Sequence, residues 1–237
     1  MTFLQGLVTN DVNRLPTGPL YAALLTPQGK YLADFFLSDG GDHVLIDVAA
    51  PLADDLIRRL QMYRLRADVE IAPDERHVHQ GLGPPPDGAF ADPRLPELGW
   101  RRYDTTPAPP PTPEALAARL ALRIAHCAPE SGTELIPGET YILEAGFERL
   151  NGVDFRKGCY VGQEVTARMK HKTRLRKGLC TVRVEGHAPV GTPIMVAGRQ
   201  AGTLYSQAEG RGIAYLRFDR AKGAMRAENA TVWADCS

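Results

Sequence analysis

The chain has 237 residues, of which 43% are hydrophobic and 24% are charged, a balance typical of a folded protein and too apolar for a disordered one. Lys plus Arg total 28 and Asp plus Glu total 28, so no overall field draws the protein to nucleic acid or to an anionic membrane. The apolar runs are too short to cross a bilayer and the start lacks a signal-peptide pattern, so we expect a cytoplasmic protein.

The first part of the chain predicts strands followed by a helix. Residues 20–48 hold β-branched and aromatic runs separated by glycine and proline turn signals, which is typical of a sheet. Residues 51–65 begin with a proline, carry acids early and arginines late, and predict an amphipathic helix. Its apolar stripe consists of Leu52, Leu56, Leu60 and Tyr63. Residues 67–72 predict a further strand, so this half reads as α+β.

A proline-rich stretch follows over residues 83–113. So many prolines exclude a regular helix or an inner strand, and we expect a long ordered crossing. Thr112 then precedes Pro113 and Glu114, which is a helix start, and apolar residues continue at helical spacing to an end near Pro129.

The most distinctive stretch is "GVDFRKGCYVGQEVTARM", residues 152–169, where Cys159 lies between two glycines. The segment after Gly162 predicts a helix with Glu164 in its first turn. Cys159 then precedes a helix N-terminus and follows Arg156 and Lys157, and both features favour the reactive thiolate. The alternative is a small, partly buried residue in a glycine turn.

The cysteines as a set show no pairing pattern. Cys127, Cys159, Cys180 and Cys236 form no C-x-x-C pair and lack zinc-type histidine spacing, so we expect neither a disulfide framework nor a metal site. From residue 178 onward, short alternating runs punctuated by glycine and proline predict a small antiparallel sheet or barrel.

Four segments carry a family resemblance: "FLQGLVTNDV", "PQGKYLADFFL", "ADPRLPELGWR" and above all "KGCYVGQEVTAR". They resemble the YgfZ family of folate-binding proteins linked to iron-sulfur enzyme maintenance, within the superfamily of the glycine-cleavage aminomethyltransferase. The resemblance implies an α+β fold in which two ferredoxin-like units form a folate cavity and an antiparallel β-barrel follows.

This fold implies three sequence ranges. We expect an N-terminal α+β unit at 1–82, a second α+β unit with the cysteine motif at 83–172, and the barrel at 173–237. The resemblance begins almost at Met1, where relatives have an additional opening strand. We therefore expect either a true start upstream of Met1 or a first sheet that lacks an edge partner.

The resemblance also implies a folate site. Within "YILEAGFERL", Glu144 matches a glutamate that accepts two hydrogen bonds from the pterin ring in the aminomethyltransferases. The candidate folate contacts are Glu144, Lys157, Tyr160, Gln163, Glu164, Arg168 and Arg174. For the motif residues the alternative is a helix-capping and salt-bridge set. The basic strip from Arg168 to Lys177 favours the glutamyl tail of folate over nucleic acid, because it lacks interleaved aromatic residues.

The candidate catalytic residues are Cys159 and Asp34. The aminomethyltransferases have paired aspartates where this chain has Ala33 and Asp34, and the changed pair argues against their one-carbon transfer chemistry. Asn10 and Asp11 are equally suited to an Asx-type turn and to a ligand contact.

We therefore expect a tetrahydrofolate-binding protein that supports the assembly or repair of iron-sulfur enzymes, with those enzymes or cluster-assembly proteins as partners. Four dispersed cysteines without ferredoxin spacing argue against a cluster held by one chain. A folate-dependent aminomethyl or one-carbon transferase is the enzymatic alternative, and a folate-responsive adaptor without chemistry is the other.

Overall fold

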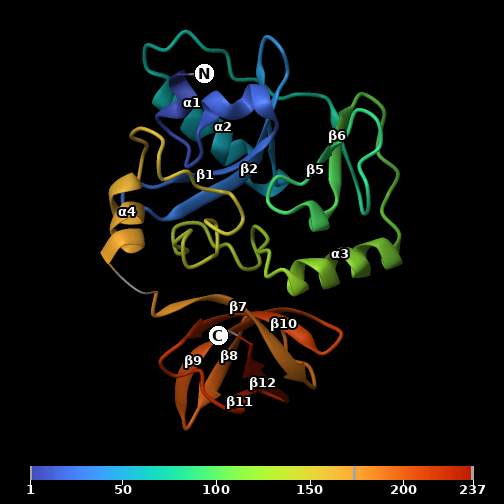
Figure 1. Ribbon diagram of the computed structural model, residues 1–237, viewed down its shortest axis with the longest axis vertical. Helices are drawn as coiled ribbons and strands as arrows, with labels where there is room; N and C mark the ends of the chain where they lie inside the picture. Colours follow the sequence, from blue (N-terminus) through green and yellow to red (C-terminus); the bar gives the residue numbers. More distant parts are fainter. Residues whose placement is uncertain (1, 173–174, 236–237) are drawn as a thin grey trace. The chain divides into compact units, whose positions relative to one another are not determined.

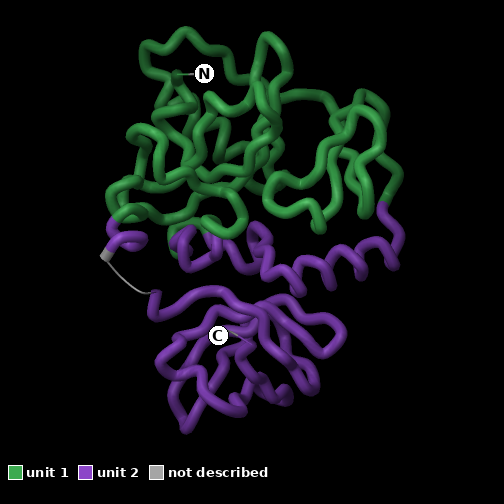
Figure 2. The backbone as a smooth tube through the Cα atoms, viewed as in Figure 1, with its two compact units in different colours: residues 1–110, 137–139, 147–167 green, residues 111–136, 140–146, 168–237 purple. Residues whose placement is uncertain are grey.

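The computed structural model describes residues 2–172 and 175–235 (Figure 1). The chain forms two compact units, each assembled from segments that are discontinuous in sequence (Figure 2). Unit 1 comprises residues 1–110, 137–139 and 147–167, and unit 2 comprises residues 111–136, 140–146 and 168–237. Because the units cut across the three sequence ranges expected as domains, those ranges stay a prediction.

Unit 1 is built on an antiparallel sheet in the order β1-β2-β3. Its strands are β1 (Leu20–Leu25), β2 (Tyr31–Asp39) and β3 (Val44–Val48). Every residue of β1 is buried, and so is every residue of β2 except the last, which explains why these runs are mostly apolar rather than alternating. The strands and turns expected over residues 20–48 are therefore confirmed.

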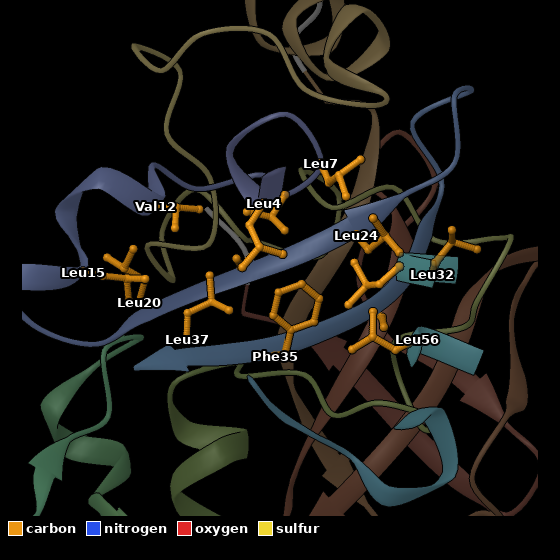
Figure 3. Packing of buried hydrophobic residues seen from close by; sticks show 14 residues of the cluster. Leu4, Leu7, Val12, Leu15, Leu20, Leu24, Leu32, Phe35, Leu37 and Leu56 are labelled. Atoms are coloured by element: carbon orange, nitrogen blue, oxygen red, sulfur yellow. The ribbon is translucent and has the colours of Figure 1, made fainter. Parts of the chain in front are cut away.

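A hydrophobic core covers one face of this sheet. The predicted helix is present as α2 (Ala50–Arg64), with a proline in its first turn and Leu56 and Leu60 buried. The short α1 (Thr2–Gln5) and the 3-10 helix η1 (Val12–Thr17) contribute Leu4, Val12 and Leu15 to the same cluster. Figure 3 shows Leu4, Val12, Leu15 and Leu56 gathered around Leu24, Phe35 and Leu37 of the sheet.

The second sheet of unit 1 has the order β4-β6-β5, with strands β4 (His77–Gly81), β5 (Phe90–Ala91) and β6 (Trp100–Asp104). The prolines of residues 83–113 lie either before β6, the last of them in η2 (Pro96–Leu98), or after it from Pro107 onward, so a proline-free stretch forms the inner strand. The expectation that residues 83–113 contain no inner strand is therefore wrong. The strand expected over 67–72 is also wrong, because alternation alone cannot supply a neighbouring strand to pair its backbone.

Unit 2 contains α3 (Pro113–Ala125) and a closed barrel. Thr112 caps α3 by accepting a hydrogen bond from the backbone N–H of Ala115, as its sequence position indicates. The helix ends at Ala125, a little before the predicted end near Pro129. Helix α4 (Gln163–Lys172) follows the cysteine motif, and its residues from Arg168 onward belong to unit 2.

The barrel order is β10-β7-β12-β11-β8-β9, with antiparallel neighbours. Its strands are β7 (Lys177–Glu185), β8 (Thr192–Val196), β9 (Arg199–Ala208), β10 (Arg211–Arg217), β11 (Met225–Ala227) and β12 (Ala230–Ala234). The alternating burial of β7 fills the interior with small and branched side chains. The expected α+β fold with a C-terminal antiparallel barrel is confirmed.

Two further observations concern the whole described chain. No helix in residues 2–172 and 175–235 is long and apolar enough to span a membrane. Cys127 and Cys159 form no disulfide, whereas Cys180 is disulfide-bonded. The expectation of a chain without disulfides is therefore wrong at Cys180, because pairing depends on approach in space, which cysteine spacing does not show.

Candidate functional site

The cysteine motif forms an exposed loop that leads into α4. Cys159 is exposed and precedes Gln163, the first residue of the helix. Its neighbour Lys157 is buried, with 7% of its surface exposed. The loop therefore presents the thiol to solvent while a residue two positions earlier anchors it in unit 1.

Lys157 supplies the anchor through its ammonium group. The Nζ atom donates hydrogen bonds to the backbone carbonyls of Gln5 at 2.9 Å, Val8 at 2.5 Å and Asn10 at 2.8 Å. All three donors of the ammonium group are thereby directed at backbone of the N-terminal segment. Lys157 holds the loop in place through these bonds, and the expected folate contact of Lys157 stays a prediction.

Burial sets the protonation behaviour of Lys157. Desolvation lowers the pKa of its amine to about 8, against the opposing influence of the carboxylates of Asp11 and Asp154. The neutral amine has only two N–H donors for the three carbonyls. Raising the pH through this range therefore neutralises the amine and leaves one of the three carbonyls without its hydrogen bond.

The other motif residues occupy different surroundings. Tyr160 is buried, and burial raises the pKa of its phenol to about 12. Gln163 is half-buried at the start of α4, whereas Glu164 and Arg168 are exposed on that helix. Arg174, the remaining predicted contact, lies outside the described residues.

Asp34 lies inside unit 1, on β2, and accepts two phenol hydrogen bonds. The Tyr21 hydroxyl donates to Oδ2 at 2.9 Å and the Tyr31 hydroxyl donates to Oδ1 at 2.6 Å. Burial raises the pKa of Tyr21 well above its usual value, and the charge of Asp34 raises it further. Tyr21 therefore remains a donor, and Asp34 is fitted to a structural role in the sheet.

Arg94 completes this cluster, and our reading of individual residues missed it. Its guanidinium donates to both oxygens of Asp92, at 3.0 and 2.7 Å, and lies 5.4 Å from the Tyr21 ring centroid and 5.0 Å from that of Phe36. Asn151 donates to the backbone carbonyl of Arg94 at 3.2 Å. Arg94 belongs to the segment "ADPRLPELGWR", which carries the family resemblance. That resemblance pointed to the segment but not to the role of any single residue in it.

Asn10 and Asp11 form hydrogen bonds within the chain, as the turn role predicts. The Asn10 amide donates to the carbonyls of Tyr21 and Asn151 at 2.8 and 2.7 Å, and Asp11 caps η1. These bonds give both side chains a local structural role.

Glu144 lies in unit 2, with 9% of its side chain exposed. The Tyr215 hydroxyl donates to Oε2 at 2.6 Å, and the Lys177 ammonium lies 3.8 Å from Oε1. The backbone carbonyl of Glu144 accepts from the N–H of Leu179 at 2.7 Å, which fixes the residue to β7. Burial and the hydrogen bond to Glu144 raise the pKa of Tyr215, so its phenol stays a donor.

The Glu144 carboxylate faces a pocket of about 230 Å³ within unit 2. Met169 and Leu175 form apolar walls, and three cations line it as well: Arg176, Lys177 and Arg217. Sequence reasoning placed Arg176 and Lys177 in a basic strip but missed Arg217 and Tyr215. Both belong to β10, whose alternation predicts a strand but does not show which side chains point toward Glu144.

The residues that line this pocket fit one end of a folate molecule. The volume is below the roughly 300–1,000 Å³ common for sites that enclose a whole ligand, so it suits the bicyclic pterin ring alone. A pterin presents adjacent N–H donors, and each carboxylate oxygen accepts two hydrogen bonds, so Oε2 can serve both Tyr215 and the ring. Within the described residues, no group of three or more His, Cys, Asp or Glu is placed to hold a metal ion.

Comparison with known proteins gives a consistent result. The model of the CAF17 C-terminal β-barrel domain matches residues 176–235. The mitochondrial iron-sulfur cluster assembly factor IBA57 of Mus musculus is 30% identical over 265 residues, covering 94% of this chain and 74% of the mouse protein. The Homo sapiens protein of the same name is 30% identical over 264 residues, with the same two coverages of 94% and 74%.

Fungal relatives are longer. The mitochondrial IBA57 homolog of Neurospora crassa is 31% identical over 222 residues, which cover 79% of this chain but 51% of the fungal protein. Among solved structures, the glycine cleavage system aminomethyltransferase T from Bartonella henselae matches with a TM-score of 0.73 and 14% identity, covering 99% of this chain and 80% of that one. At this identity the match shows the shared fold alone.

The comparison overturns one expectation. The relatives in mouse, Neurospora and Mycosarcoma maydis are named as mitochondrial proteins, so the prediction of a cytoplasmic protein is wrong. That prediction rested on the lack of a signal-peptide pattern, and such a pattern marks secretion rather than entry into an organelle.

Proposed function

We propose, from the premise that this chain belongs to the IBA57 family of iron-sulfur cluster assembly factors, that it supports the assembly of iron-sulfur clusters and holds a tetrahydrofolate at Glu144. The observation that carries the folate part is the buried Glu144 carboxylate, which faces an apolar pocket lined by cations. A carboxylate in such surroundings is costly to desolvate unless it gains strong donors, and the pterin ring supplies them.

The chain's own residues divide the work of binding. Tyr215 and the backbone N–H of Leu179 orient Glu144, while Met169 and Leu175 exclude water from the ring. Lys177 balances the charge of the carboxylate and contacts the Tyr215 ring, with its Nζ 5.5 Å from the ring centroid. When bound, tetrahydrofolate supplies a carrier for one-carbon units.

Cys159 is the residue we assign to the cluster pathway. Its thiol is exposed on a loop that Lys157 anchors, so a partner protein can reach it. One thiol cannot hold a cluster, because iron-sulfur clusters require several ligands. We therefore assign Cys159 a transient contact with a cluster or with a cluster-assembly protein that provides the remaining ligands.

The surroundings of Asp34 favour this role over one-carbon transfer. Each carboxylate oxygen accepts a buried tyrosine hydroxyl, and Ala33 stands where the transferases have a second aspartate. A carboxylate held in this way is poorly placed to assist chemistry at a folate nitrogen.

The role in cluster assembly and the binding of folate are tested in separate experiments, of which the first concerns cluster assembly. Cells that lack their own factor are supplied with the wild type, Cys159→Ser or Cys127→Ser, and the activity of a [4Fe–4S] enzyme is measured. We expect the wild type and Cys127→Ser to restore activity and Cys159→Ser to fail at equal protein level. Full rescue by Cys159→Ser would favour the adaptor without thiol chemistry.

Binding of tetrahydrofolate is measured independently by anaerobic calorimetry on the purified wild type. Saturable binding supports the folate site at Glu144. Rescue of the enzyme by a wild type that binds no tetrahydrofolate would retain the assembly role and remove the folate.

A further inference from the structure

A second pocket, of about 470 Å³, lies wholly within unit 1 and shares no residue with the site around Glu144. Its volume falls in the range of roughly 300–1,000 Å³ that is common for small-molecule sites. It is formed by the end of η1, the β2–β3 hairpin and the second sheet. Neither the folate site nor the cysteine loop uses it.

The walls of this pocket combine polar groups with an apolar part. Leu15 and Pro16 contribute from η1 and Leu45 from β3. Phe90 and Tyr103 contribute two aromatic rings, whose centroids are 5.6 Å apart at an interplanar angle of 55°. Such walls suit a compact apolar body, and the ring faces also attract a cation.

The charged groups around the pocket have a negative balance. Arg76 lines it, but its Nε and Nη2 donate to Asp74 at 2.8 and 2.7 Å, so this pair is neutral. His43 Nε2 lies 2.8 Å from the same Nη2 of Arg76. Because a guanidinium nitrogen can only donate, His43 Nε2 accepts this hydrogen bond. The single proton of the neutral His43 ring is then on Nδ1, which donates to Asp42. Asp39 also lines the pocket, and only its Oδ1 accepts a bond among the described residues, from Gly41 N–H at 2.8 Å.

We propose that this pocket binds an organic amine, with the apolar body against Leu45, Phe90 and Tyr103 and the ammonium group at Asp39. The free Oδ2 of Asp39 accepts from the ammonium, and the aromatic faces add a cation–π attraction. A carboxylate at the same place would meet Asp39 without a free cation to balance it. This assignment is independent of the folate site and of the role of Cys159.

The test uses three probes of nearly equal size: 2-phenylethylamine, 2-phenylethanol and 3-phenylpropanoate. Each is titrated at neutral pH into the full chain, and binding is followed by protein-observed NMR. An exposed ion pair contributes about two- to fivefold in affinity, and cation–π contact adds a similar factor. We therefore expect the amine to bind roughly tenfold more tightly than the acid, with the alcohol between them.

Two variants assign the effect to the pocket. Asp39→Asn keeps the Oδ1 that accepts from Gly41 and removes the charge, so the amine should lose about two- to fivefold while the alcohol is unaffected. Asp54→Asn, an exposed aspartate on α2, is the matched control and should change nothing. The proposal is overturned if no probe saturates, if the amine binds no better than the alcohol, or if the two variants behave alike.

Discussion

The phenol of Tyr215 donates a 2.6 Å hydrogen bond to the carboxylate of Glu144, across 71 residues of sequence. This bond leaves Glu144 Oε1 facing Lys177 at 3.8 Å, a distance too long for a hydrogen bond. The carboxylate is therefore fixed from one side while its other oxygen remains available. This asymmetry is the basis for expecting a ligand at Glu144.

Replacing Glu144 with Gln should weaken tetrahydrofolate binding by about 1.5 to 3 kcal/mol, or roughly tenfold to a hundredfold. Glutamine keeps the volume, but it removes the charge and turns one acceptor into a donor that opposes a pterin N–H. Anaerobic calorimetric titration measures the change, and melting curves check the fold. Glu209→Gln, at an exposed position of the barrel, is the control. Equal affinity of the wild type and Glu144→Gln would remove this residue from the site.

Tyr215→Phe tests positioning separately from charge. The variant retains the ring beneath Lys177 but loses the hydroxyl that orients Glu144, so we expect a loss of about threefold to tenfold in tetrahydrofolate affinity. Combining it with Glu144→Gln should add little further loss, because both changes act on one interaction. Additive losses in this double-mutant cycle would show that Tyr215 contributes to binding by a different route.

Cys159 should be alkylated faster than Cys127 in the folded protein. Cys159 is exposed, whereas Cys127 is half-buried, and Cys180 is disulfide-bonded and cannot react before reduction. Brief treatment with limiting iodoacetamide, followed by mass-spectrometric mapping without reductant, measures the order. Faster labelling of Cys127 would contradict the assignment of Cys159 as the accessible thiol.

Asp34→Asn should destabilise the protein and leave tetrahydrofolate affinity unchanged. The amide presents N–H donors to one of two buried phenols that now donate to the carboxylate, which should cost about 1 to 3 kcal/mol of unfolding free energy. Urea unfolding measures the loss, with the exposed Asp87→Asn as control. A variant of normal stability with altered folate affinity would return Asp34 to the binding site.

The sequence predicts local structure well where a local signal decides it. The helix after Gly162 and the cap at Thr112 depend on residues within one turn, and both are present. Barrel strands follow from alternation, because the pleat places every second side chain inside. The inner strand Trp100–Asp104 was missed, since proline density was averaged over a window that includes a proline-free stretch.

Contacts between distant residues account for what the sequence could not show at the site. Lys157 reads as a cation beside the thiol, yet its partners are backbone carbonyls 147 to 152 residues away, which no side-chain pattern encodes. The pairing of Tyr215 with Glu144 likewise depends on how the barrel packs on the segment that carries the glutamate. The family resemblance identified Glu144, but only the structure shows what surrounds it.

Lys157 gives the protein a stability that depends on pH, and its sign follows from the lowered pKa. Burial lowers the pKa of the Lys157 amine from 10.5 to about 8, so between these values the unfolded chain binds one more proton than the folded chain. Stability contributed by Lys157 should therefore rise with pH from about 8 to 10.5 and stay constant below 8.

Urea unfolding of the wild type and Lys157→Met from pH 7 to about 10 isolates this contribution, because other groups cancel in the difference. Lys222→Met, at an exposed position, is the matched control. The contrary outcome is a difference in unfolding free energy between the wild type and Lys157→Met that falls as the pH rises. It would mean that the pKa of Lys157 is higher in the folded than in the unfolded chain, because the three carbonyls stabilise the ammonium more than burial disfavours it.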